Sequence, residues 1–177
     1  MTRTALVLTV SDGVTAGTRE DASGLALAER LAQLDWMVER ALVPDERAAI
    51  AAALTAGAAR HRLVISTGGT GLTPRDVTPQ ATAGVLDYEI PGIPEAMRAA
   101  GRRSTPLADL SRAKAGVIGR TLVINVPGSP RGALESLEAV VPLLDHAVRT
   151  LAGPYDHGAA GQVPGPAVAH IDPREDT

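Results

Sequence analysis

Residues 66–82, STGGTGLTPRDVTPQAT, place three glycines, several hydroxyls, an arginine and an aspartate directly after the apolar run 62–67. A strand-to-helix turn needs one glycine or two, so this composition indicates a loop that holds a ligand. The apolar run is typical of a buried strand. Thr78-Pro79 is typical of a helix start, where Thr caps the helix and Pro occupies its first turn. The stretch therefore predicts a strand, a ligand-binding loop and a helix in succession.

Strands and helices alternate along most of the chain. Apolar or alternating runs predict strands at 4–10, 37–43, 62–67, 114–119 and 121–126. Helical spacing or an alanine-rich composition predicts helices at 21–34, 45–60 and 93–103. This alternation predicts an α/β fold with a largely parallel sheet that is covered on both faces.

The C-terminal third predicts the end of a single domain. Ser129-Pro130 repeats the pattern of a helix start, and an apolar stripe continues to residue 151. Pro142 predicts a break into two short helices, because proline removes a helical hydrogen bond. Residues 154–177 are rich in Gly and Pro without a periodic apolar pattern, which predicts a flexible tail after a domain of residues 1–153.

Composition excludes several classes of protein. The chain has 177 residues with a net charge of −3, 2% aromatic residues and no basic block, so nucleic acid is not an expected partner. No apolar stretch approaches the roughly 20 residues that span a membrane. The chain contains no cysteine and no leader-like segment, and we expect a cytoplasmic protein that uses neither thiolates nor disulfides.

Polar loops follow the predicted strands at 11–13, 67–76 and 126–129, and Asp45 follows another strand. Ligands of parallel sheets collect at the carboxyl ends of the strands, so we expect these groups on one rim. Backbone amides of TGGTG can converge on an anion, and NVPGSP leads into a helix amino end. Two such loops indicate a ligand with more than one phosphate; alternatively, both are tight connections. The predicted ligand contacts are Ser11, Asp12, Thr67, Gly68, Gly69, Thr70, Gly71, Arg75, Pro127, Gly128 and Ser129.

Standard phosphate motifs are absent from the sequence. A Walker loop ends in Gly-Lys-Ser/Thr, but Lys114, the one lysine, precedes Ala115. The residues after the first strand, SDGVTAG, do not form the dinucleotide-binding fingerprint. The four histidines lack metal-ligand spacing and a serine partner.

Two aspartates are candidates for the chemistry. Asp76 follows Arg75, and a carboxylate beside bound phosphates suits Mg²⁺ while the arginine opposes phosphate charge or pairs with a neighbour. The alternative for Asp76 is ordinary turn chemistry. Asp45 follows Pro44 at a predicted helix start, where its plainest interpretation is an N-cap.

At these residues the sequence resembles a known family. TGGTGLTPRDVTPQAT is similar to the signature of the MogA/MoaB family of molybdenum cofactor biosynthesis, which includes a domain of gephyrin. The segments VSDG, VPDE, EIPGIPEAMR, LSRAKAGVI and NVPGSP follow in the family's order, and the likeness extends to about residue 155.

The resemblance implies a three-layer α/β fold, a homotrimer and binding of molybdopterin, a pterin with a dithiolene and a terminal phosphate. In the MogA branch it implies transfer of AMP from Mg²⁺-ATP to molybdopterin with release of pyrophosphate. The family's two important acidic residues match Asp76, as the Mg²⁺ ligand, and Asp45, which would orient the metal-nucleotide or the pterin. Glu89, Ser111 and Arg112 match family segments without an assigned role.

The resemblance also leaves an alternative. The segment 130–151 lacks an insertion that some MogA proteins carry, and is closer to MoaB-type proteins. The alternative function is therefore binding of molybdopterin without adenylylation.

Overall fold

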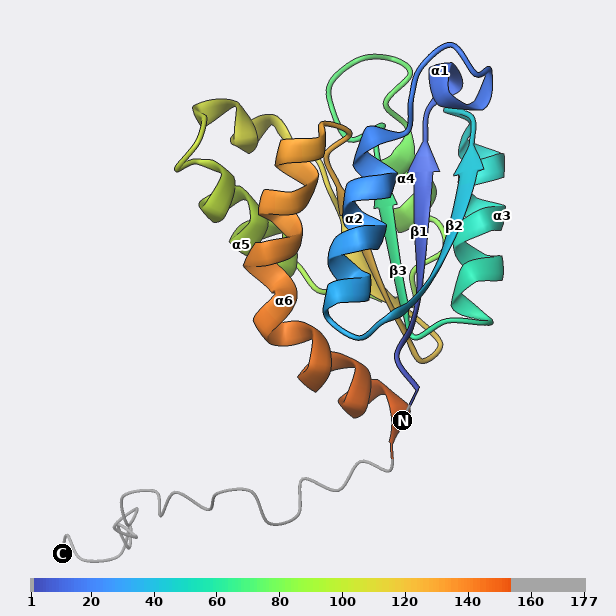
Figure 1. The fold of residues 1–177 in the computed structure, drawn as a ribbon, viewed down its shortest axis with the longest axis vertical. Helices are drawn as coiled ribbons and strands as arrows, with labels where there is room; N and C mark the ends of the chain where they lie inside the picture. The colour runs from blue at the N-terminus through green and yellow to red at the C-terminus, as the bar shows by residue number, and fades with distance from the viewer. Residues whose placement is uncertain (1, 154–177) are drawn as a thin grey trace, which may run out of the picture.

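A six-stranded sheet in the order β2-β1-β3-β6-β5-β4 forms the centre of the computed structural model, which describes residues 2–153 (Figure 1). The strands are β1 (Thr4–Val10), β2 (Met37–Val43), β3 (Leu63–Thr67), β4 (Tyr88–Glu89), β5 (Ala115–Ile118) and β6 (Thr121–Val126). β2, β1, β3 and β6 run parallel, whereas β5 is antiparallel to both β6 and β4. The predicted α/β fold with a mostly parallel sheet is confirmed.

Helices cover both faces of this sheet. They are α1 (Asp12–Thr15), α2 (Ala22–Gln33), α3 (Arg47–Ala58), α4 (Thr78–Ala83), α5 (Gly92–Gly101), the 3₁₀ helix η1 (Pro106–Leu110) and α6 (Pro130–Ala152). Successive side chains of a strand point to opposite faces. Ala5 and Val7 of β1 belong to the core formed with α2, α5 and α6, whereas Leu6, Leu8 and Val10 belong to the core formed with α3 and α4. The result is the expected three-layer sandwich.

One prediction about the fold is wrong. α6 continues through Pro142 as a single helix of 23 residues, where we expected two short helices. Its inner face buries Leu137, Val140, Leu144 and Val148 in the core. Burial of each such side chain contributes about 1.5–3 kcal/mol, which together exceeds the roughly 3 kcal/mol cost of an internal proline. Figure 1 shows that α6 bends part-way along its length, as proline-containing helices do.

Three short elements were not predicted, and one predicted cap is wrong. α1 has four residues, β4 two and η1 five, which is too short to show a hydrophobic period. Thr78 is the first residue of α4 and does not cap it. Its hydroxyl instead donates a hydrogen bond to the carbonyl of Gly68, at 2.9 Å, and ties the helix to the glycine-rich loop.

Within residues 2–153, no helix combines the length and apolar character that a membrane span requires. The predicted flexible tail, residues 154–177, lies outside the described residues.

Candidate active site

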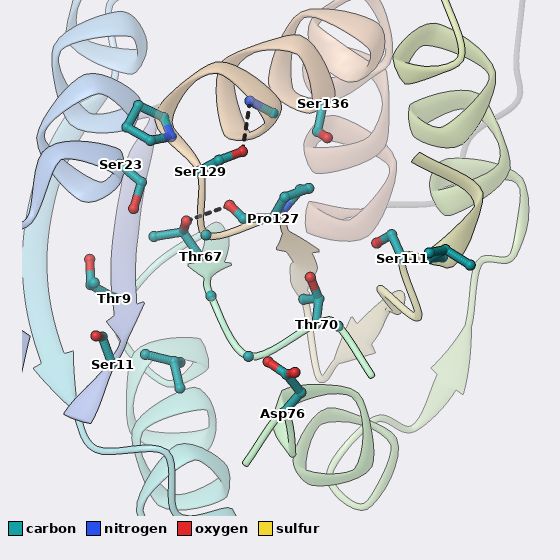
Figure 2. A pocket seen from close by; sticks show the side chains of 18 of the residues that line it. Thr9, Ser11, Ser23, Thr67, Thr70, Asp76, Ser111, Pro127, Ser129 and Ser136 are labelled. Atoms are coloured by element: carbon teal, nitrogen blue, oxygen red, sulfur yellow. Dashed lines mark hydrogen bonds between the residues drawn. The ribbon is translucent and has the colours of Figure 1, made fainter. Parts of the chain in front are cut away.

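A cavity of about 640 Å³ opens at the carboxyl ends of β1, β3 and β6. Its lining includes Ser11, Asp45, Thr67, Gly68, Gly69, Thr70, Gly71, Arg75, Asp76, Pro127, Gly128 and Ser129. These are the predicted site residues with one exception, Asp12, which lies beside the cavity and not among its lining residues. Figure 2 shows Asp76 and several hydroxyl side chains arranged around this space.

The glycine-rich loop adopts a backbone that only glycine accommodates easily. Gly68 and Gly69 have φ values of 102° and 62°, in the left-handed region. A Cβ atom on Gly68 would lie 2.3 Å from the carbonyl oxygen of Val10. A Cβ atom on Gly69 would lie 2.4 Å from the hydroxyl of Thr78 and 3.1 Å from Oδ1 of Asp45. The backbone of this loop therefore passes close to Asp45.

The loops after β3 and β6 are joined to each other. The hydroxyl of Thr67 donates to the carbonyl of Pro127 at 2.8 Å, and the amide of Gly68 donates to Val126 at 3.2 Å. Thr67 was expected to donate to an anion, and this expectation is wrong because its proton already binds Pro127. Among residues 2–153, the amides of Gly69 and Thr70 have no backbone partner, so they remain free to face a ligand.

Asp76 closes the glycine-rich loop from the other side. Its Oδ2 accepts a hydrogen bond from the amide of Thr73 at 2.8 Å. Burial alone would raise the pKa of Asp76, but hydrogen bonds from Thr73 and Gly71 and the charge of Arg112 outweigh it and lower the pKa. Asp76 is therefore a carboxylate at neutral pH, as a metal-binding or phosphate-facing role requires.

Arg112 fixes the backbone around Asp76, a role that its place in the sequence did not reveal. Its guanidinium donates to the carbonyls of Gly71, at 2.7 Å, and of Asp76, at 2.6 Å. Its own amide donates to the carbonyl of Thr70 at 3.0 Å. Three hydrogen bonds from one residue hold the loop open toward the cavity.

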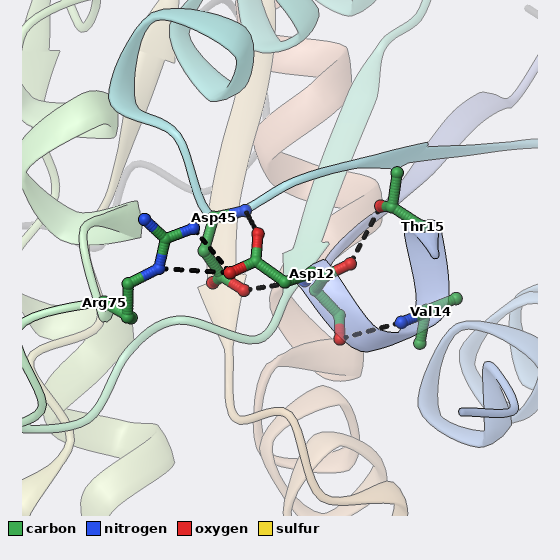
Figure 3. Close-up of polar contacts among 6 residues, drawn as sticks. Asp12, Val14, Thr15, Asp45 and Arg75 are labelled. Carbon is green, nitrogen blue, oxygen red and sulfur yellow. Dashed lines mark hydrogen bonds and ion pairs between the residues drawn. The ribbon is translucent and has the colours of Figure 1, made fainter. Parts of the chain in front are cut away.

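Asp45 does not cap α3, contrary to its plainest interpretation from the sequence. The N-cap position belongs to Glu46, which makes no capping hydrogen bond through its side chain. Oδ2 of Asp45 instead accepts from the amide of Asp12 at 2.9 Å, and the amide of Asp45 donates to Oδ1 of Asp12 at 2.9 Å (Figure 3). Arg75 completes the cluster by donating to Oδ2 of Asp12 at 2.5 and 3.1 Å.

Ser129 and Ser11 are helix caps that also line the cavity. The hydroxyl of Ser129 accepts from the amide of Gly132, which confirms the predicted cap of α6. Ser11 accepts from Val14 at the start of α1. The amino end of α6 therefore faces the cavity, and its dipole favours an anion there.

The opposite wall of the cavity was not predicted. It comes from α5, η1 and α6 and combines apolar Met97, Leu107 and Leu110 with Ser111 and Ser136. Leu107 and Leu110 are 67% and 50% exposed. An apolar wall with a few hydroxyls suits a flat ring system better than it suits phosphate.

Comparison with known proteins identifies the family. The sequence pattern of a family described as a probable molybdopterin binding domain matches residues 6–146. The chain belongs to this molybdopterin-binding family.

Individual relatives agree with this membership. A molybdopterin adenylyltransferase of Helicobacter pylori is 39% identical over 156 residues, covering 84% of this chain and 88% of the relative. The crystal structure of the molybdopterin biosynthesis enzyme MoaB from Thermus thermophilus is 49% identical, with a TM-score of 0.80 over 86% of this chain and 99% of that chain. A structure of MogA is 40% identical, with a TM-score of 0.80 over 84% of this chain and 99% of that chain.

The wall of the cavity carries charged residues of both signs. The lining residues include three arginines, Arg19, Arg75 and Arg98, and four acidic residues, Glu20, Asp45, Asp76 and Glu135. Within residues 2–153, no cluster of three or more His, Cys, Asp or Glu side chains could bind a metal alone.

Proposed function

We propose that this protein is a molybdopterin adenylyltransferase of molybdenum cofactor biosynthesis, which transfers AMP from Mg²⁺-ATP to the terminal phosphate of molybdopterin and releases pyrophosphate. The proposal rests on family membership and on relatives that carry this name at 39% identity. One structural observation supports it most: a single cavity combines the glycine-rich loop, the amino end of α6 and the carboxylates of Asp45 and Asp76.

The size and chemistry of the cavity support two substrates that meet at their phosphates. Its volume of about 640 Å³ lies within the range of about 300–1,000 Å³ that is typical of ligand sites. The free amides of Gly69 and Thr70 and the amino end of α6 suit phosphate groups. The wall formed by Met97, Leu107 and Leu110 suits a heteroaromatic ring.

Three buried hydroxyls add polar contacts for a ligand. Ser23, Thr70 and Ser136 are 7%, 5% and 6% exposed, and all three line the cavity. Each can donate or accept a hydrogen bond at small cost in conformational entropy. Their positions around the cavity, visible in Figure 2, suit the polar edges of a pterin or a purine.

The reaction needs no nucleophile from the protein. An oxygen of the terminal phosphate of molybdopterin attacks the α-phosphorus of ATP and forms a new P–O bond. The bond between the α-phosphorus and the α,β-bridging oxygen breaks, and pyrophosphate leaves with that electron pair. Such transfers depend mainly on positioning and on neutralising charge, which the loop amides and Arg75 would supply.

The residues present fit a magnesium ion that enters with ATP. Mg²⁺ usually binds through one or two carboxylates, water and substrate phosphates. Asp76 would hold the ion, directly or through water, and Asp45 would orient the metal-nucleotide or the pterin. When bound, Mg²⁺ supplies positive charge that stabilises the leaving pyrophosphate.

Incubation with molybdopterin, ATP and Mg²⁺ tests this function, with adenylyl-molybdopterin and pyrophosphate as the measured products. We expect both products in equal amounts, and neither without Mg²⁺. The 49% identity to a MoaB protein favours one second candidate, a protein that binds molybdopterin without adenylylating it. Measurable binding of molybdopterin with no product above background would establish that candidate and refute the transferase.

The proposal includes assembly and location. We propose a homotrimer in the cytoplasm that binds neither nucleic acid nor membranes and whose domain comprises residues 1–153. Large apolar side chains at both edges of the sheet support an interface, because Met37 of β2 and Tyr88 of β4 are 64% and 55% exposed. Light scattering should give three times the monomer mass, and a monomer would refute the trimer.

A further inference from the structure

We propose that Asp12 is a positioning residue for the reaction, which acts by fixing the carboxylate of Asp45 against the glycine-rich loop. The inference deepens the proposed function, because it assumes that Asp45 takes part in that reaction. It also revises the expectation that Asp12 contacts the ligand itself.

The contacts between Asp12 and Asp45 are reciprocal. The amide of Asp12 donates to Oδ2 of Asp45, and the amide of Asp45 donates to Oδ1 of Asp12, both at 2.9 Å. The two hydrogen bonds join the first residue of α1 to the loop after β2, 33 positions apart. The first holds one carboxylate oxygen of Asp45, and the second holds the backbone that carries this side chain.

The other oxygen of Asp45 lies beside the glycine-rich loop. The Cβ position of Gly69 lies 3.1 Å from Oδ1 of Asp45, and both residues line the cavity. Asp12 does not line the cavity. Asp12 can therefore affect a bound ligand only through a residue that it contacts, such as Asp45.

Arg75 fixes Asp12 in turn. Its Nε and Nη2 both donate to Oδ2 of Asp12, so the two oxygens of this carboxylate have separate partners. The hydrogen bond from the Asp45 amide, and then the contact with Arg75, lower the pKa of Asp12. Asp12 thus stays ionised and keeps both of its partners in place.

The chain permits variants that remove these contacts one at a time. Asp12→Asn keeps an oxygen for the Asp45 amide and keeps its own amide. Asp12→Ala loses the acceptor but keeps the donor. Asp12→Pro loses both, and its ring would displace Oδ2 of Asp45. Proline suits this position because Asp12 is the first residue of α1 and Ser11 is extended, with φ −168° and ψ 122°.

The kinetic test measures kcat for these variants in the wild-type and Asp45→Ala backgrounds. We expect kcat within about 3-fold of wild type for Asp12→Asn, about 3–10-fold lower for Asp12→Ala and about 10–100-fold lower for Asp12→Pro. In the Asp45→Ala background the same changes should have no further effect, because Asp12 acts through Asp45. Additive losses in that background would overturn the inference.

Two controls separate this inference from the proposed function and from general damage. Asp145→Ala removes a half-buried aspartate that pairs with Arg3, and should leave kcat unchanged. Crystal structures of Asp12→Ala and Asp12→Pro test the inference without turnover. They should show the Asp45 carboxylate displaced from the glycine-rich loop, and an unmoved carboxylate would refute the inference even if the wild-type enzyme proved inactive.

Discussion

Replacing Gly69 by alanine is the sharpest test of the site geometry. A methyl group at this position would lie 2.4 Å from the hydroxyl of Thr78 and 3.1 Å from Oδ1 of Asp45. The backbone also has φ 62°, which disfavours any residue with a Cβ atom. The variant therefore combines a backbone penalty with a steric one.

The two penalties can be estimated separately. A left-handed backbone costs a non-glycine residue about 1–2 kcal/mol. Overpacking by one methyl group in a tight site costs about 1–3 kcal/mol. We expect Gly69→Ala to lower the free energy of unfolding by about 2–5 kcal/mol, the sum of both.

A second glycine provides the matched control. Gly119 has φ 59° with no atom within 4 Å of its Cβ position, so Gly119→Ala isolates the backbone penalty. Urea denaturation of both variants should show that Gly69→Ala has a lower free energy of unfolding than Gly119→Ala. The difference should equal the steric penalty, about 1–3 kcal/mol. Equal destabilisation of the two variants would refute the close approach of the loop to Thr78 and Asp45.

Three further predictions concern other parts of the molecule. Asp76→Asn should lower adenylylation by about 10²-fold or more while circular dichroism shows a folded protein, because a neutral amide is a poor ligand for Mg²⁺; unchanged turnover would exclude Asp76 from the mechanism. The hydrogen bond from Arg30 lowers the pKa of Glu138 in the folded protein. The pair should therefore stabilise the fold at any pH above the unfolded pKa of Glu, about 4.3. This stabilisation should disappear as the pH falls through the lower pKa that Glu138 has in the folded protein. The pair is half-exposed, so Glu138→Gln should cost less than about 1 kcal/mol at pH 7, and melting curves between pH 2 and pH 7 should show the difference vanish in acid. Pro142→Ala should raise the free energy of unfolding by about 1–2 kcal/mol, because it restores a hydrogen-bond donor inside α6, and a lower urea midpoint would contradict this.

The sequence carried enough information to predict the rim of the sheet. Polar residues follow the strand ends at Ser11, Thr67 and Ser129, and parallel strands bring such ends together. The positive φ values of Gly68 and Gly69 explain why the loop needs adjacent glycines. Local composition and one topological rule therefore suffice for this half of the site.

Contacts between distant segments could not be predicted in the same way. The exchange of hydrogen bonds between Asp12 and Asp45 depends on the pairing of β1 with β2, which sets the height of each loop. Asp45 looks like a helix cap in the sequence because Asp is common both at helix N-caps and in polar loops. Pro142 looks like a helix break because its local cost is visible in the sequence, whereas the burial that offsets it is not.

The bond between Thr67 and Pro127 has a consequence for the order of events during synthesis. It joins loops that are 60 positions apart, so this wall of the cavity is complete only once β6 has paired with β3. A chain emerging from the ribosome would thus complete the cavity only after β6 and the first turn of α6 have left the exit tunnel. The cavity would therefore form late in synthesis, together with the pairing of β6 and β3.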